Sequence, residues 1–205
     1  MALLRTLSLS LALLLAGGAT LYAATDGFQA FTTESARRVA VRRQPVDVPA
    51  VALQTQSGER IDLAGLRGKW LLVDFIYTRC PSYCVALGSE FAQLQQRLAG
   101  PLAQGQVELL SISFDPAHDT PQELGAYLQR ARSHGAGWLA ARPVEAGGLA
   151  RLERSFGITV IAGASGEYTH NAAIHVVDPQ GRLVDIVDLG QSGLAARAVQ
   201  QGLAP

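Results

Sequence analysis

The sequence predicts an α/β fold in three layers, a mixed β-sheet with helices on both faces, behind an N-terminal apolar segment. Two observations support this fold class. Apolar runs that suit buried strands alternate with segments whose apolar residues repeat at helical spacing. In addition, two strand-like runs near the C-terminus are joined by a tight turn, so they should form an antiparallel pair. The earlier strands are separated by helices and can be parallel, and the sheet as a whole is therefore expected to be mixed.

Composition narrows the class of protein. The chain has 205 residues, 48% of them hydrophobic, which is enough for one domain with a buried core and an appendage. Its 17 basic residues balance its 17 acidic residues, which argues against binding to nucleic acid or to membranes through a polybasic patch. The 2 cysteines exclude a disulfide-dense scaffold and any four-cysteine metal site, so they are expected to act as one pair.

The N-terminus resembles a targeting segment. Arg5 precedes the apolar stretch Leu7–Ala24, and Gly17, Gly18 and Ala19 could form a cleavage site. As a helix this stretch would be roughly 27 Å long, close to the ~30 Å of a bilayer core. A cleaved signal and a retained anchor therefore both remain open for residues 1–24. In either case we expect the rest of the chain to work outside the cytoplasm.

A linker is predicted between this segment and the folded domain. Residues 25–49 are polar and basic, include Pro45 and Pro49, and have no long periodic run. A brief helical turn around Thr33–Val41 is compatible with the sequence. The domain proper is expected over residues 50–205.

The first half of this domain alternates strands and helices. Val51–Gln54 and Glu59–Leu63 suggest a small hairpin. Trp70–Tyr77 is a nearly continuous apolar run, typical of a central strand, and Val107–Phe114 predicts a second one. Between them, Val85–Leu98 has its apolar residues in one helical stripe.

The second half begins with a helix start signal. Thr120-Pro121-Gln122-Glu123 is a capping-box pattern with proline at the first helical position, which predicts a helix to about Arg132. Asp178-Pro179-Gln180-Gly181 predicts a hairpin turn. The other expected elements are a helix at Glu145–Phe156, strands at Ala172–Val177 and Arg182–Val187, and a final helix at Ser192–Leu203.

The chemistry concentrates at Cys80 and Cys84, where the Trp70–Tyr77 strand ends and a helix begins. Four positions are about one helical turn, so both sulfurs share a face. Pro81 suits the first helical position, which would put Cys80 at the positive end of the helix and favour its thiolate. Two thiolates select Cu(I) or Zn²⁺ over hard cations. The pair could equally form a redox-active or a purely structural disulfide in an oxidising compartment.

Three motifs in order resemble the Sco/SenC family of thioredoxin-like copper-delivery proteins of respiratory membranes. The run VDFIYTRCPSYC is similar to the family signature, and SFDPAHDTP, which begins at Ser113, is similar to its second block. His170 stands where the family carries its metal-binding histidine. Thr169 and Asn171 depart from the family, which more often has Asp before this histidine and Ser or Thr after it. The resemblance covers about residues 50–187 and implies a thioredoxin-like fold.

The resemblance also implies a function. Cys80, Cys84 and His170 would hold one copper ion, as Cu(I) or, with an added donor, Cu(II). The protein would be a metallochaperone, not an enzyme, delivering copper to the binuclear copper centre of cytochrome c oxidase on the periplasmic side of the inner membrane. Expected partners are the copper-receiving oxidase subunit and another copper chaperone or a thiol reductase. The alternative is a thiol–disulfide oxidoreductase that reduces the cysteines of that centre through Cys80 and Cys84.

Other polar residues have more ordinary interpretations. His170 and His175 would point to opposite sheet faces if they shared one continuous strand, so His175 is expected to be structural. Asp74, inside an apolar strand, is expected to be either a buried carboxyl group with a raised pKa or a hydrogen-bonded residue. The remaining candidates are two solvent-facing histidines, His118 and His134, and two carboxylates near the edge of the site, Asp115 and Asp119.

Overall fold

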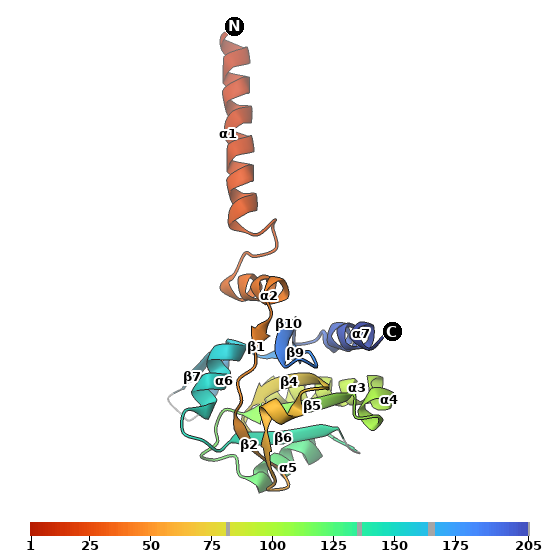
Figure 1. The fold of residues 1–205 in the computed structure, drawn as a ribbon. Coiled ribbons are helices and arrows are strands. Elements are labelled where there is room, and N and C mark those ends of the chain that lie inside the picture. Colours follow the sequence, from red (N-terminus) through yellow and green to blue (C-terminus); the bar gives the residue numbers. More distant parts are fainter. Residues whose placement is uncertain (81–82, 135–136, 164–166, 205) are drawn as a thin grey trace. The chain divides into compact units, whose positions relative to one another are not determined.

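The computed structural model of the protein describes residues 1–80, 83–134, 137–163 and 167–204 (Figure 1). The chain divides into two compact units, Met1–Gln44 and Pro45–Pro205. Each unit is described by itself.

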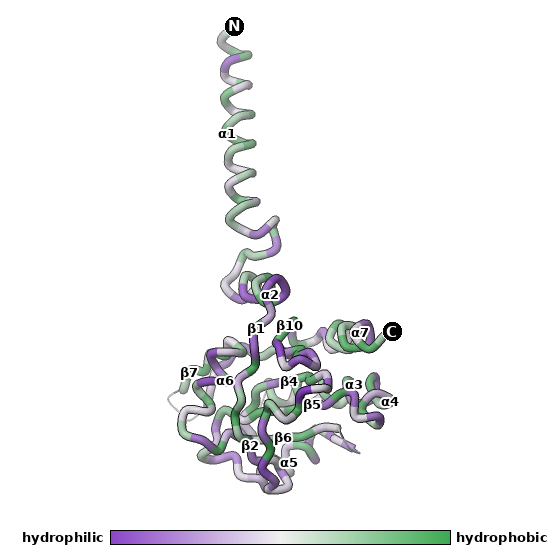
Figure 2. The backbone as a smooth tube through the Cα atoms, viewed as in Figure 1, coloured by the Kyte–Doolittle hydropathy of each residue, from purple (hydrophilic) through white to green (hydrophobic). Residues whose placement is uncertain are grey.

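The first unit contains two helices, α1 (Ala2–Ala24) and α2 (Thr33–Arg43). Helix α1 carries the predicted apolar segment, and its stretch Leu3–Ala24 is long and apolar enough to cross a membrane. Figure 2 shows the hydrophobic colouring along most of its length. Helix α2 replaces the brief turn expected at Thr33–Val41 with a full helix, because Thr32 and Ser35 form a capping box at its start.

The second unit is built on one mixed sheet, as predicted. Among the described residues its strand order is β1-β10-β9-β4-β5-β6-β2-β3. Strands β4, β5 and β6 are parallel to one another, and every other neighbouring pair is antiparallel. The strands are β1 (Val46–Asp47), β2 (Ala52–Thr55), β3 (Arg60–Asp62), β4 (Trp70–Ile76), β5 (Val107–Ser113), β6 (Trp138–Pro143), β9 (Ala173–Val177) and β10 (Arg182–Asp188).

Helices cover both faces of this sheet. Adjacent residues of a strand point to opposite faces, so Asp74 and Phe75 of β4 show what covers each side. Phe75 contacts Phe156 of α6, with ring centroids 5.2 Å apart. On the other face, Asp74 lies in electrostatic range of Cys84 in α3 and Tyr127 in α5. The helices are α3 (Tyr83–Arg97), α4 (Ala99–Ala103), α5 (Pro121–Arg130), α6 (Gly148–Phe156) and α7 (Ser192–Leu203), with a short 3₁₀ helix at Leu63–Leu66.

The two central strands form the core of the unit. Every residue of β5 is buried, and so is every residue of β4 except the half-buried Trp70. Strands enclosed on both faces need continuous apolar sequence, which explains why the runs at 70–77 and 107–114 were recognisable. The predicted hairpins are also confirmed, as β2–β3 and β9–β10. In the second turn Asp178 accepts hydrogen bonds from the amides of Gln180 and Arg182.

Several elements differ from the sequence-based prediction. Strand β6 was not predicted, because its Ala-rich run ending in Pro143 has low strand propensity and is stabilised only by neighbours on both sides. Helix α6 begins at Gly148, not at Glu145, because Gly147 adopts a left-handed conformation with φ of 75°. The sheet already includes Val46, upstream of the expected start at residue 50.

A second, two-stranded sheet was also not predicted. It pairs β7 (Val160–Ala162) with β8 (Tyr168–His170) in antiparallel fashion. His170 therefore ends β8 and does not open the next strand, β9, which begins at Ala173. The assumption of one continuous strand through His170 and His175 was wrong, because residues 171 and 172 interrupt it.

Candidate metal centre

The two cysteines lie at the start of α3, directly after β4. The backbone N–H of Cys84 donates a hydrogen bond to Sγ of Cys80 at 3.4 Å, and neither cysteine is in a disulfide. A free helical N–H directed at this sulfur favours its thiolate form, as expected for a cysteine at a helix N-terminus. The first-turn position predicted for Pro81 lies outside the described residues.

The two thiols differ in their surroundings. Cys80 is half-buried, whereas Cys84 is only 3% exposed. Burial raises the pKa of the Cys84 thiol well above its usual value, and the neighbouring Cys80 and Asp74 raise it further. Cys80 is therefore the accessible sulfur of the pair, and Cys84 carries a proton at neutral pH.

Asp119 fixes the loop that leads to Cys80. Its fully buried carboxylate accepts hydrogen bonds from the backbone N–H and the hydroxyl of Thr78, the latter at 2.7 Å. It also accepts one from the hydroxyl of Ser113 at the end of β5. Asp119 thus holds the loop after β4 against the end of the neighbouring strand, β5.

A second carboxylate, Asp115, holds the next residue of this loop. It is 5% exposed, and it pairs with the guanidinium of Arg79 at 2.7 Å and with Nδ1 of His118 at 2.8 Å. His118 itself projects outward, with 56% of its side chain exposed. The second sequence block thus supplies both carboxylates that position residues 78–79, immediately before Cys80.

His170 lies at the end of β8, and its imidazole is 8% exposed. Neither ring nitrogen has a hydrogen-bond partner among the described residues, and the burial lowers the pKa of the ring. An unsatisfied buried imidazole is costly, and its lone pair is free for a metal ion. The strand that follows His170, β9, runs antiparallel to β4, because Val73 pairs with His175.

Aromatic rings lie next to both His170 and the cysteines. The ring of Phe114 contacts His170 and Tyr77, at centroid distances of 4.9 and 5.3 Å. The hydroxyl of Tyr77 accepts a hydrogen bond from the amide of Tyr168. Burial raises the pKa of Tyr77, and the two cysteines raise it further, so its hydroxyl lies in electrostatic range of both sulfurs. This aromatic cluster was not predicted from the sequence, although Tyr77 and Phe114 each end an apolar strand run.

Cys80, Cys84 and His170 are donors that suit a soft metal ion, although their side chains are not gathered around one point. Within the described ranges, no three His, Cys, Asp or Glu side chains form a group that could hold a metal ion. Cys80 and Cys84 lie together, while His170 lies beside the aromatic cluster. Two sulfurs and one imidazole match the preferences of Cu(I).

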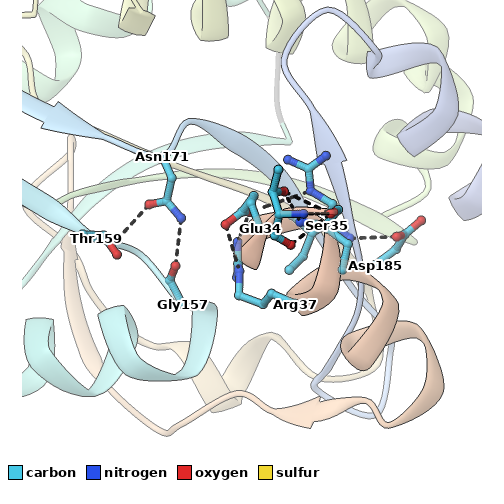
Figure 3. Close-up of polar contacts among 10 residues, drawn as sticks. Glu34, Ser35, Arg37, Gly157, Thr159, Asn171 and Asp185 are labelled. Carbon is cyan, nitrogen blue, oxygen red and sulfur yellow. Dashed lines mark hydrogen bonds and ion pairs between the residues drawn. The ribbon is translucent and has the colours of Figure 1, made fainter. Parts of the chain in front are cut away.

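Asn171 anchors the segment that carries His170. Its side-chain oxygen accepts a hydrogen bond from the amide of Thr159 at 2.8 Å, and its NH₂ group donates one to the carbonyl of Gly157 at 2.9 Å. Figure 3 shows both contacts. These bonds join the end of β8 to the turn after α6. The departure from the family pattern at Asn171 thus has a local structural role.

Two other buried polar residues, Asp74 and His175, lie on the central strands β4 and β9. Nδ1 of His175 is 3.2 Å from the carbonyl oxygen of Val73, and its ring packs between Phe75 and Phe156, which supports the structural interpretation. Asp74 is fully buried, and neither carboxyl oxygen is hydrogen-bonded among the described residues. Burial raises its pKa to about 7.

Comparisons with known proteins agree with this architecture. A sequence model of the SCO1/SenC family matches residues 44–201. A protein of Stutzerimonas stutzeri described as a putative copper-binding protein is 30% identical over 140 residues, which are 66% of this chain and 66% of that protein. The matches to this protein and to two further curated relatives, from Bacillus subtilis and Bos taurus, span 39% to 66% of the lengths of those proteins.

Solved structures share the fold. The copper-bound structure of Bradyrhizobium japonicum ScoI has a TM-score of 0.63 and 26% identity, and the match covers 77% of this chain and 99% of that one. A SCO1/SenC family lipoprotein from Bacillus anthracis has a TM-score of 0.69 and 21% identity, covering 78% of this chain and 97% of that one. The predicted thioredoxin-like architecture is thereby confirmed.

Proposed function

Because the chain belongs to the SCO1/SenC family, we propose that it is a copper metallochaperone that binds one copper ion through Cys80, Cys84 and His170. It delivers this ion to the binuclear copper centre of cytochrome c oxidase during assembly of the oxidase. The observation that carries the proposal is the buried imidazole of His170, neither nitrogen of which is hydrogen-bonded within the part of the chain that the structure describes. The copper-binding description of the Stutzerimonas relative and the copper-bound Bradyrhizobium protein support copper as the cargo.

The environments of the three donors suggest an order of binding. Cys80 is the accessible sulfur, so its thiolate meets the incoming Cu(I) first. Cys84 then releases its proton as it binds, because only thiolates are good ligands. His170 supplies a neutral nitrogen without losing a proton, because burial disfavours its charged form. Delivery runs in reverse, with ligands of the recipient replacing these donors one by one.

The apolar helix of the first unit supports a proposal for the compartment. Helix α1 suits either an export signal or an anchor, and Sco proteins are described as cytochrome c oxidase assembly proteins. We therefore place the domain on the periplasmic side of the inner membrane, where the copper-receiving oxidase subunit is the partner. Another copper chaperone would load the site, or a thiol reductase would keep its cysteines reduced.

A copper titration tests the ligand set. The reduced full chain in neutral detergent should take up one Cu(I) per chain in competition with a chelator. Cys80→Ala or Cys84→Ala should abolish this uptake. His134→Ala, which removes an exposed imidazole, should leave the uptake unchanged. Unchanged affinity in either cysteine variant would refute the assignment.

One observation favours a second candidate, a thiol–disulfide oxidoreductase. An accessible cysteine at a helix N-terminus paired with a buried, protonated one is the asymmetry that such a reaction needs. The thiolate of Cys80 would attack a partner disulfide and release one partner thiolate. The thiolate of Cys84 would then attack the mixed disulfide, leaving a Cys80–Cys84 disulfide and a reduced partner. His170 has no part in this reaction.

A further inference from the structure

A groove of about 730 Å³ runs alongside the cysteine pair. Cys80 and Cys84 line it, helix α3 forms one wall, and the end of α5 with the residues after it forms the other. His170 is not among the described residues that line it. The three-donor copper site therefore does not account for this groove.

The wall formed by α3 sets the length of the groove. Cys84, Gly88, Ala92 and Gln96 recur at every fourth position, so they lie along one side of the helix and all line the groove. Twelve helical positions correspond to ~18 Å. An extended peptide rises ~3.3 Å per residue, so about five residues would fill this length. The groove is thus too long for a small thiol to fill.

The opposite wall follows α3 over the same length. At the cysteine end, the guanidinium of Arg130 donates a hydrogen bond to the carbonyl of Thr78 at 3.1 Å. At the other end, the amide of His134 donates to the side-chain oxygen of Gln95 at 3.1 Å. Thr78 and Gln96 line the groove with side chains that can hydrogen-bond to the backbone of a peptide.

The charge of the groove is positive. Arg130 and Arg132 both line it and are exposed, and the described lining residues include no Asp or Glu. Neither guanidinium forms an ion pair with a carboxylate of the described chain. A groove lined by positively charged side chains, without compensating negative ones, is complementary to an anionic partner.

Arg132 also adopts a conformation that arginine disfavours. Its φ is 60°, at the position after the end of α5 where glycine is usual. A side chain held in the left-handed region carries strain, which proteins keep mainly at functional positions. A cation is thus present where glycine would suit the backbone better.

We propose that this groove binds an extended acidic segment, about five residues long, of the protein that receives copper from the cysteine pair. The inference rests on the proposed function, since it assigns a docking surface to the recipient. The acidic segment would lie against Arg130 and Arg132 and bring the acceptor's ligands to Cys80. Because the contact is electrostatic and lies at the surface, it should weaken as salt is added.

Peptide titrations followed by NMR test the proposal. The probe is a ten-residue peptide of alternating Glu and Ser, and its control replaces each Glu with Gln. TROSY spectra of the ¹⁵N-labelled, reduced full chain in neutral detergent should show saturable shifts for the acidic peptide at the amides of Gly88, Ala92 and Arg132. The Gln peptide should bind at least tenfold more weakly, and 0.5 M salt should remove the preference. Shifts that are absent, scattered over the surface or equal for both peptides would overturn the proposal.

Arg132→Gly is the decisive variant, because it removes a cation and relieves the backbone. It should keep or raise the thermal unfolding midpoint while weakening binding of the acidic peptide at least threefold. Arg60→Ala removes an exposed arginine that does not line the groove, and it should bind like the parent. Unchanged binding in Arg132→Gly, or groove shifts with reduced glutathione but not with the acidic peptide, would rule out the acidic segment.

Copper uptake separates this proposal from the proposed function. Arg132→Gly should still bind one Cu(I) per chain. If all variants and the parent fail to bind Cu(I) while the acidic peptide still binds, the copper assignment fails and the docking surface stands. If copper binds and the acidic peptide does not, the docking surface fails alone.

Discussion

Burial decides the charge of three groups around the cysteine loop. Asp74 has its pKa raised to about 7, Cys84 is held as a thiol, and His170 is held as a neutral imidazole. All three shifts have the same main cause, the loss of water around the charged form. Burial thus favours the uncharged form of all three groups, whereas the N–H at the start of α3 favours the thiolate of Cys80.

Asp74 should make the protein less stable as pH rises. Its pKa is raised from 3.8 to about 7, so the folded state binds more protons than the unfolded state between these values. Stability contributed by the neutral carboxyl is therefore present below pH 4 and is lost as pH rises towards 7, by up to about 4 kcal/mol. Asp74→Asn, which stays neutral, should remove this loss. Urea unfolding of the reduced protein at several pH values between 5 and 8 measures the difference.

The control for this prediction is Asp47→Asn, which changes an exposed carboxylate on β1. Its stability should follow that of the parent at every pH. The lowered pKa of His170 has the opposite sign, since it costs stability as pH falls below about 6.5, but it is common to all three proteins and cancels. Parallel stability profiles for Asp74→Asn and the parent would contradict the prediction.

His170→Ala separates copper delivery from disulfide reduction. The variant loses one of three donors, so Cu(I) affinity should fall and oxidase activity in cells at limiting copper should drop. Its disulfide exchange in a purified assay should continue, because Cys80 and Cys84 remain. His175→Ala is an unsuitable control, since that ring packs in the core, so His118→Ala serves instead. Normal oxidase activity in His170→Ala would favour the reductase.

At the scale of elements, two loops hold the site together. The loop after β4 carries Cys80 and is fixed by Asp115 and Asp119 from the loop after β5. This arrangement follows from parallel pairing, since the carboxyl ends of β4 and β5 lie at the same edge of the sheet. The other part of the site is the β7–β8 hairpin, which carries His170 at its end and which Asn171 joins to the turn after α6.

Asp119→Asn should loosen the cysteine loop. The substitution keeps the shape but puts an NH₂ group where the carboxylate accepts bonds from Thr78 and Ser113, so we expect a loss of about 2–3 kcal/mol. Cu(I) affinity should fall as well, although no copper ligand is changed. Urea unfolding and chelator competition measure the two effects. Asp62→Asn, at an exposed helix cap where Asn serves as well as Asp, should change neither.

Most of the elements could be predicted from sequence because their patterns are local. Examples are the apolar runs of β4 and β5, the turn at Asp178 and the start of α5 at Thr120. Strand β6 could not be predicted, since its Ala-rich residues become a strand only between β5 and β2. The place of His170 was misjudged for a related reason, because among the described strands β8 pairs with β7 and not with the main sheet.

Of the candidate site, sequence alone predicted the residues but not their surroundings. The spacing of Cys80 and Cys84 and the helix that follows them could be read directly from the chain. The contact of His170 with Phe114, and the clamp of Asp119 on Thr78, join segments 41 or more positions apart. Such contacts depend on strand order, which composition and periodicity do not encode.

At the scale of the whole molecule, the apolar helix α1 predicts export. A reporter fused after Pro45 should be active only if it works outside the cytoplasm, as alkaline phosphatase does, because α1 would direct or anchor the following chain across the membrane. The enzyme activity of each fusion in whole cells measures this. A fusion with residues 2–24 deleted is the matched control and should lose the activity. A stable signal from a cytoplasmic reporter at this junction would contradict the prediction.

The order of strands in the sheet has a consequence for when the protein can fold. Val46 of β1 pairs with Leu183 of β10, and Leu53 of β2 pairs with Pro143 of β6. Pairings so distant in sequence form slowly, and none can form before its later strand is available. In a chain that crosses the membrane N-terminus first, Cys80 and Cys84 would therefore emerge while β9 and β10 were still being translocated. During that interval their thiols would lack the shielding of the finished fold, and any agent that protects newly exported cysteines would have to act then.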